Sequence, residues 1–125
     1  MRTWPALIVD VGCIAVFAAV GRSNHGEPLD LLGVADTAWP FLVGYLVGLV
    51  LSRGWQHPVA RSTALVLWAT TVVGGMLLRL VSGAGVQLSF VVVTAIVLAA
   101  LLLGWRGILT LAQRARARSG HRAAA

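Results

Sequence analysis

The chain has 125 residues, of which 58% are apolar and only 11% are charged, and its formal net charge is +6 at pH 7. A soluble domain has about 25% charged residues, so a water-soluble protein of this size could not cover so much apolar surface. The composition therefore predicts a small integral membrane protein, and it argues against nucleic acid as the partner of the basic charge. The single cysteine, Cys13, excludes an intrachain disulfide and a thiolate metal site.

Four apolar stretches are long enough to cross a bilayer core of about 30 Å, which needs about 20 helical residues. They cover residues 4–21, 39–53, 63–81 and 88–105. A segment in lipid must satisfy its own backbone hydrogen bonds, so each is expected to be a helix. The sequence predicts an all-α fold in which four transmembrane helices form a compact bundle over residues 1–105. An Arg-rich cytoplasmic tail over residues 106–125 follows.

The second span is expected to begin near Trp39. Asp36 or Thr37 would cap the helix, and Pro40 would lie in its first turn, where the missing N–H does no harm.

A faint internal repeat offers a second description of the bundle. Residues 41–55 and 90–105 both begin with Phe and end in Gly-Trp beside an Arg. Two repeated helical hairpins, related by an axis along the membrane normal, would give this pattern, and so would chance in a chain built from few residue types.

The distribution of arginines predicts the orientation. The N-terminus, the segment between the second and third spans, and the tail hold most of them: Arg2, Arg53, Arg61, Arg106, Arg114, Arg116, Arg118 and Arg122. The opposite side has only Arg22 and Arg79. By the positive-inside rule, we expect a multi-pass protein of the cell inner (plasma) membrane with both termini in the cytoplasm. Asp10 inside the first apolar run argues against the alternative of a cleaved signal peptide.

Asp10 is the first candidate site residue. An acidic side chain inside a span is energetically costly and usually faces the bundle interior or a water-filled cavity. At a similar estimated depth lie Tyr45, Thr70 and Thr71, whose hydroxyls can donate hydrogen bonds to it. These residues suggest an ion or solute pathway with Asp10 as a proton or cation site. The alternative is a polar contact that fixes the first helix to its neighbours.

Arg22, His25, Glu27 and Arg79 form a second candidate cluster on the outer face. The two arginines end the two outward-running helices, where a cation is favoured and a long side chain can reach the interface. Brought together with His25, they would make an anion-binding or gating cluster, with Glu27 as the counter-charge. No spacing supports a metal site here, and none is predicted.

Small residues indicate where helices pack closely. Gly44 and Gly48 form a GxxxG pattern in the second span, and Gly74 and Gly75 are adjacent in the third. The Arg-rich tail is expected to bind anionic lipid of the inner leaflet. No cofactor is expected, and the motifs of phosphate-binding loops, serine hydrolases and zinc proteases are missing. The sequence therefore does not predict an enzyme.

Several short motifs together resemble a known family. They are Asp10 in the first span, GRSNHGE at residues 21–27, TAWPFLVG at 37–44, TTVVGGMLLR at 70–79 and FVVVT at 90–94. The combination resembles the small bacterial and archaeal membrane proteins catalogued as domain of unknown function 3054. The resemblance implies a four-span membrane protein without a known activity. The family's recurrent residues would correspond here to Asp10, Arg22, His25, Trp39, Pro40, Gly74 and Arg79.

Two functional hypotheses remain open. The first is a proton-linked or ion/small-solute transporter that works as a homo-oligomer, because four short helices barely enclose a route. The second is an accessory or scaffold subunit of a larger membrane complex, in which the intramembrane polar groups pair with partner helices.

Overall fold

The computed structural model describes residues 3–24, 26 and 30–124. Within these residues the chain is entirely helical apart from its connections, and no strand occurs. The helices are α1 (Thr3–Asn24), α2 (Leu31–Ser52), α3 (Arg61–Val81), α4 (Leu88–Leu98) and α5 (Gly104–Ala124), and a short π-helical segment, η1 (Ala99–Leu103), joins α4 to α5. Four helices are long and apolar enough to cross a membrane. This confirms the prediction of an all-α membrane bundle.

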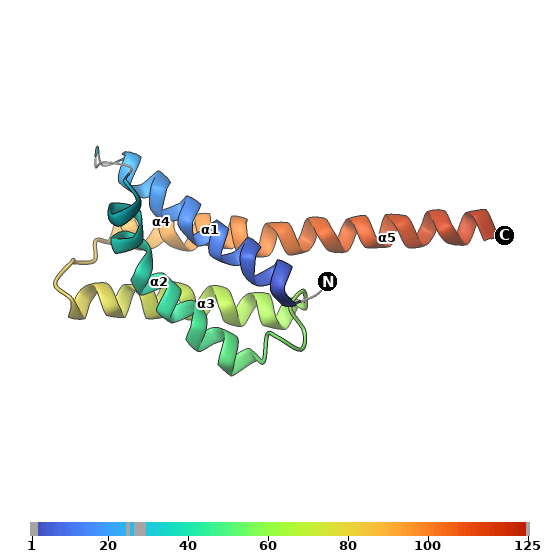
Figure 1. Cartoon of the computed structure of the whole chain (residues 1–125), viewed down its shortest axis with the longest axis horizontal. Coiled ribbons are helices and arrows are strands. Elements are labelled where there is room, and N and C mark those ends of the chain that lie inside the picture. Colours follow the sequence, from blue (N-terminus) through green and yellow to red (C-terminus); the bar gives the residue numbers. More distant parts are fainter. Residues whose placement is uncertain (1–2, 25, 27–29, 125) are drawn as a thin grey trace.

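The two ends of the bundle differ in the elements that form them. Figure 1 shows the start of α1, the connection between α2 and α3, and α5 at one end, which we call the α5 end. The end of α1, the start of α2 and the connection from α3 to α4 lie at the other end, which we call the Arg79 end. This is the topology on which the orientation was predicted. Which end faces the cytoplasm stays a prediction.

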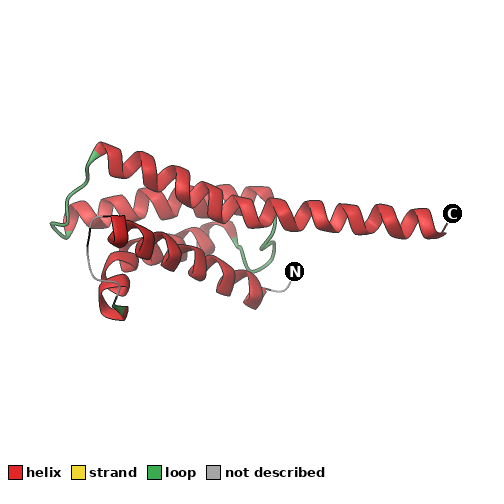
Figure 2. Ribbon diagram, turned by 90° about the horizontal axis from the view of Figure 1, so that it is seen from above, coloured by secondary structure: helices red, strands yellow, loops and turns green. Residues whose placement is uncertain are grey.

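The last transmembrane segment is one continuous helix that extends beyond the bundle. Its apolar-to-basic stretch, Leu88–Gly120, has 33 residues, about 50 Å of helix, against a bilayer core of about 30 Å. In Figures 1 and 2 the second half of α5 extends away from the other helices. The Arg-rich segment is therefore helical and continuous with the span, and the helix does not stop at the predicted boundary near Trp105.

The expected start of the second span is wrong. Helix α2 begins at Leu31, and Asp30 occupies the capping position, so Asp36 and Thr37 lie inside the helix. Pro40 is also inside it and is buried. The apolar residues before Asp36 extend the helix by two turns. A membrane helix tolerates an internal proline because neighbouring helices and local adjustments satisfy the freed backbone group.

Helices α2 and α3 approach each other most closely, and glycines make this possible. A Cβ atom at Gly44 would lie 2.6 Å from the backbone oxygen of Thr70, and one at Gly74 would lie 2.9 Å from the Cα of Gly44. A Cβ at Gly48 would overlap the side chain of Thr70, and one at Gly75 would overlap the ring of Phe41. All four glycines singled out from the sequence thus lie in the α2–α3 contact, where small residues let backbones approach.

Candidate functional site

The centre of the α5 end is a buried ion pair between Asp10 of α1 and Arg106 of α5. Both side chains are almost fully enclosed, since Asp10 is 0% and Arg106 is 3% exposed. The guanidinium binds the carboxylate through two bonds, with Nη2 at 2.6 Å from Oδ2 and Nη1 at 2.7 Å from Oδ1. A bidentate, charge-assisted pair of this length is the strongest hydrogen-bonded arrangement available to these two groups.

Two aromatic residues complete the shell around the carboxylate. The hydroxyl of Tyr45 on α2 donates to Oδ2 at 2.5 Å, and the indole nitrogen of Trp105 donates to Oδ1 at 2.9 Å. Asp10 therefore accepts four hydrogen bonds. We call Asp10, Tyr45, Trp105 and Arg106 the Asp10 cluster. It joins the first, second and last membrane segments at one point.

Arg106 also binds the backbone on both sides of the cluster. Its Nε donates to the carbonyl of Pro58, in the connection between α2 and α3, at 2.8 Å, and its Nη1 donates to the carbonyl of Leu102 at 2.9 Å. Leu102 belongs to η1, and the sulfur of Cys13 contacts the carbonyl of Leu101 in the same segment at 3.8 Å. Helix η1 precedes Trp105 and Arg106. Because a π-helical turn holds more residues than an α-helical turn, we expect η1 to set the rotation at which both residues face Asp10.

The threonines expected beside Asp10 have other surroundings. The hydroxyl of Thr70 donates to backbone carbonyls of its own helix, those of Val66 at 2.9 Å and Leu67 at 3.2 Å. The hydroxyl of Thr71 is buried without a hydrogen-bond partner among the described residues. Of the residues grouped with Asp10 from the sequence, the structure therefore brings only Tyr45 into contact with it.

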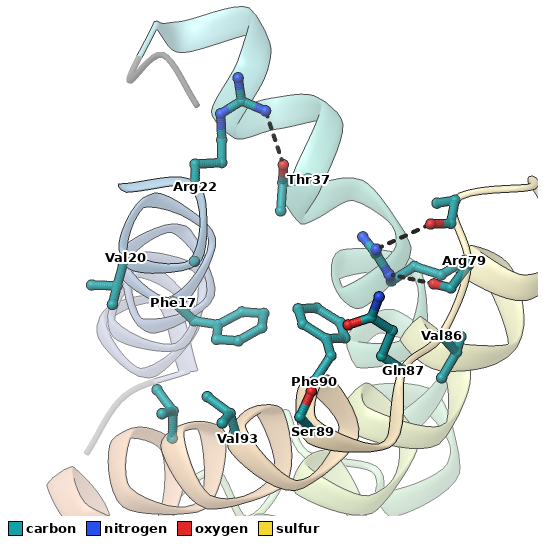
Figure 3. A pocket seen from close by; sticks show the side chains of 14 residues that line it. Phe17, Val20, Arg22, Thr37, Arg79, Val86, Gln87, Ser89, Phe90 and Val93 are labelled. Atoms are coloured by element: carbon teal, nitrogen blue, oxygen red, sulfur yellow. Dashed lines mark hydrogen bonds between the residues drawn. The ribbon is translucent and has the colours of Figure 1, made fainter. Parts of the chain in front are cut away.

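A pocket of about 440 Å³ occupies the Arg79 end, between the end of α1, the start of α4 and the connection before α4. Figure 3 shows Arg22 and Arg79 on different sides of it, with the rings of Phe17 and Phe90 next to each other on a third side. Both arginines expected to form an outer cluster thus line one pocket. We call it the Arg22–Arg79 pocket.

Arg79 is held in the pocket wall by neutral groups. Its Nε donates to the carbonyl of Gly85 at 3.3 Å and its Nη2 to that of Ala84 at 3.5 Å, and its guanidinium carbon lies 4.5 Å from the centroid of the Phe90 ring. Gly85 adopts a left-handed conformation (φ 83°), which favours glycine and turns the chain there. Among the described residues no carboxylate lies within ion-pair distance of Arg79.

Arg22 has a different environment. Its Nη1 donates to the hydroxyl of Thr37 at 3.3 Å, and its Nη2 lies 3.8 Å from a carboxylate oxygen of Asp30, a side chain that is 61% exposed. Arg22 therefore has a counter-ion at the surface. His25 and Glu27, which were grouped with it from the sequence, lie outside the described residues.

Sequence reasoning missed two members of the Asp10 cluster. Trp105 was treated as the end of the fourth span, and Arg106 was assigned to the basic tail. A signal was available, because an acidic residue inside a span usually pairs with another polar group. Asp10 lies seven residues, about 10 Å of helix, from the start of α1. The arginine directly after the fourth span was a candidate partner at that end.

Comparison with known proteins gives one family. The family model described as "Protein of unknown function (DUF3054)" matches residues 7–109, a segment that includes both the Asp10 cluster and the Arg22–Arg79 pocket. No curated protein and no solved structure matches the chain. The resemblance noted from the sequence is thus confirmed over most of the chain. With its four apolar helices, this chain is a small multi-pass membrane protein that belongs to the DUF3054 family of proteins of unknown function.

Proposed function

We propose that this protein is a non-enzymatic transporter of a small anionic solute. The observation that carries the proposal is the contrast between the two ends of the bundle. A pocket with two arginines lies at the Arg79 end, and a closed, fully hydrogen-bonded ion pair lies at the α5 end. A solute site next to one face, with a closed contact beyond it, is the arrangement that alternating access requires in one of its states.

In this proposal the pocket receives the solute and the Asp10 cluster is the closed gate. Phe17 and Val97 line the pocket. Between it and the cluster lie the buried side chains of Ile14, Leu98 and Leu102, each with 0% exposure. A solute would pass only when this packing and the Asp10–Arg106 pair separate. Because four hydrogen bonds occupy the carboxylate in the closed state, Asp10 becomes available to a proton or cation only when Arg106 moves away.

The proposal also retains a homo-oligomer. The described part of the chain provides four membrane-crossing helices, and most of the large apolar side chains of α1 and α4 outside the core are exposed, among them Ile8, Val16, Val93 and Ile96. Lipid or a second copy would cover these faces. We expect the termini to be cytoplasmic, so that the pocket opens to the outside.

Transport is tested with the purified protein in liposomes. Efflux of chloride, acetate, phosphate and benzoate is followed after an outward gradient of each anion is imposed. At least one of the four is expected to leave faster than from protein-free liposomes. Asp10→Asn is expected to abolish this flux, because it removes the proton or cation site that Asp10 provides in the open state. Arg114→Gln, on the exposed part of α5, is the matched control that leaves the flux unchanged. Absence of protein-dependent flux for all four anions would contradict the proposal.

The alternative role as an accessory subunit is tested on protein taken from its own membranes. Native mass spectrometry in a mild detergent is expected to show copies of this chain alone. A foreign membrane protein present in stoichiometric amount would contradict a stand-alone transporter. In that case Asp10→Asn would weaken co-purification instead of flux.

A further inference from the structure

We infer that the Arg22–Arg79 pocket takes an amphipathic anion, with an oxyanion head on Arg79 and an apolar body against the two phenylalanine rings. The inference rests on the proposed function, because it names the class of solute that the same pocket receives. The head is a carboxylate or a phosphate, and the body is aromatic or aliphatic. Either a soluble organic acid or an anionic lipid could supply this chemistry.

The charge of Arg79 is the first argument. The two carbonyls of Ala84 and Gly85 orient its guanidinium without neutralising it, and the face of the Phe90 ring stabilises the cation without removing its charge. These two hydrogen bonds use Nε and Nη2, so the edge carrying Nη1 remains for an oxyanion. Guanidinium groups held in this way recognise carboxylate and phosphate oxygens.

The different ion pairing of the two arginines is the second argument. Arg22 is paired with Asp30, so its charge is already compensated at the surface. Arg79 has no such carboxylate among the described residues. Among the residues that the structure describes, Arg79 is thus the pocket cation without a carboxylate partner, and the head of the ligand belongs on it.

The remaining lining explains the apolar body. Phe17 and Phe90 face the cavity with ring centroids 6.3 Å apart, and valines from α1 and α4 continue the wall. Figure 3 shows the two rings pointing toward each other, with Arg79 beside Phe90. Phe17 is almost fully buried, whereas Phe90 is only partly buried and the valines at positions 20 and 93 are about half exposed. A small inorganic anion would leave this apolar wall in contact with water, whereas an apolar body would cover it, which is favourable by about 25 cal/mol per Å².

The size of the pocket sets an upper limit on the ligand. Its volume of about 440 Å³ is near the lower end of the range of about 300–1,000 Å³ that is typical of small-molecule sites. A single aromatic acid fits, whereas a lipid would place only its head and the first part of one chain inside. Val20 and Val93 line the pocket and are about half exposed, so part of its apolar wall is accessible from outside.

The test is ¹⁹F NMR of 4-fluorobenzoate with the full-length protein in nanodiscs of zwitterionic lipid. Binding is expected for 4-fluorobenzoate and not for the neutral 4-fluorobenzyl alcohol. Arg79→Gln is expected to weaken binding at least tenfold, Arg79→Lys to weaken it less, and Arg114→Gln to leave it unchanged. Equal binding of acid and alcohol, or full binding by Arg79→Gln that is folded by size-exclusion chromatography, would overturn the inference.

Nanodiscs that contain phosphatidylglycerol distinguish the two sources of the anion. Retained 4-fluorobenzoate binding supports a soluble organic acid as the ligand, and displacement supports the head of an anionic lipid.

The liposome assay separates this inference from the transport proposal. Binding that depends on Arg79 without any flux would contradict transport and leave the ligand class standing. Flux that Arg79→Gln does not change would contradict the ligand class and leave transport standing.

Discussion

Arg106 and Arg79 lie at opposite ends of the same bundle and have opposite environments. Arg106 is 3% exposed and binds Asp10 through two short bonds. Arg79 is held by two backbone carbonyls at 3.3 and 3.5 Å and by an aromatic face. The difference teaches that the partners, and not the residue type, decide whether an arginine of the bundle is enclosed in an ion pair or held by neutral groups.

The closed end also has an energetic cost that suits a gate. Removing both charges from water is expensive, and a buried pair often adds less stability than apolar residues of similar volume. Stability alone therefore does not require a charged pair at this position. A contact that is strong when formed, and whose charged members are well solvated when separated, can alternate between closed and open states.

The largest effect is expected from Arg106→Gln. The variant leaves the carboxylate of Asp10 buried without its cation, and breaking a buried pair in this way costs about 3–5 kcal/mol. We expect a large decrease in the thermal unfolding temperature in detergent. Arg79→Gln, at the other end, is expected to change the unfolding free energy by less than about 1 kcal/mol, because it removes only partly exposed contacts.

A double variant separates stability from gating. Asp10→Leu combined with Arg106→Met removes both charges and is expected to recover most of the lost stability. The same protein is expected to lose the controlled anion flux of the parent. If it transports normally, the Asp10 cluster is a structural contact and not a gate.

The π-helical segment gives a second test of the Asp10 cluster, in which deletion and insertion of one residue are expected to affect stability differently. A π-helical turn holds more residues than an α-helical turn, so residues after η1 face where they would in an α-helix one residue shorter. Deletion of Ala100 is therefore expected to give a regular helix that still directs Arg106 at Asp10. Insertion of an alanine after Ala100 rotates α5 by about 100° and is expected to destabilise the protein about as much as Arg106→Gln.

Thermal unfolding of both length variants checks this prediction. An ordinary α-helix between two fixed contacts would be damaged by either change. Equal loss of stability in the deletion and the insertion would show that η1 does not set the rotation of α5.

The fold was predictable from the sequence because lipid leaves few choices. Apolar length alone indicates four helices, and the glycines at positions 44 and 74 mark the closest helix contact. The start of α2 was missed because proline is common in a first turn and uncommon within a helix, although a membrane tolerates both.

The site was only partly predictable, for a different reason. Asp10, Tyr45, Arg22 and Arg79 could be chosen because polar groups in a span are costly. Arg106 was assigned to the tail because a hydropathy profile places the end of a span where charged residues begin. Such a profile carries no information on which charged side chain points into the bundle. That choice depends on η1 and on the position of Asp10 in another helix, which are properties of the folded bundle.

The smallest effects on stability are expected from removing one hydroxyl group at each end of the bundle. Tyr45→Phe removes a buried hydrogen bond to a charged acceptor and is expected to cost about 1.5–3 kcal/mol. Thr37→Val removes the half-buried bond to Arg22, 3.3 Å long, and is expected to cost less than about 1 kcal/mol. Thermal unfolding measures both. Because Tyr45→Phe retains the ion pair and loosens its shell, it is also expected to raise anion flux in liposomes. A slower flux would mean that Tyr45 helps to open the Asp10 cluster and does not hold it closed.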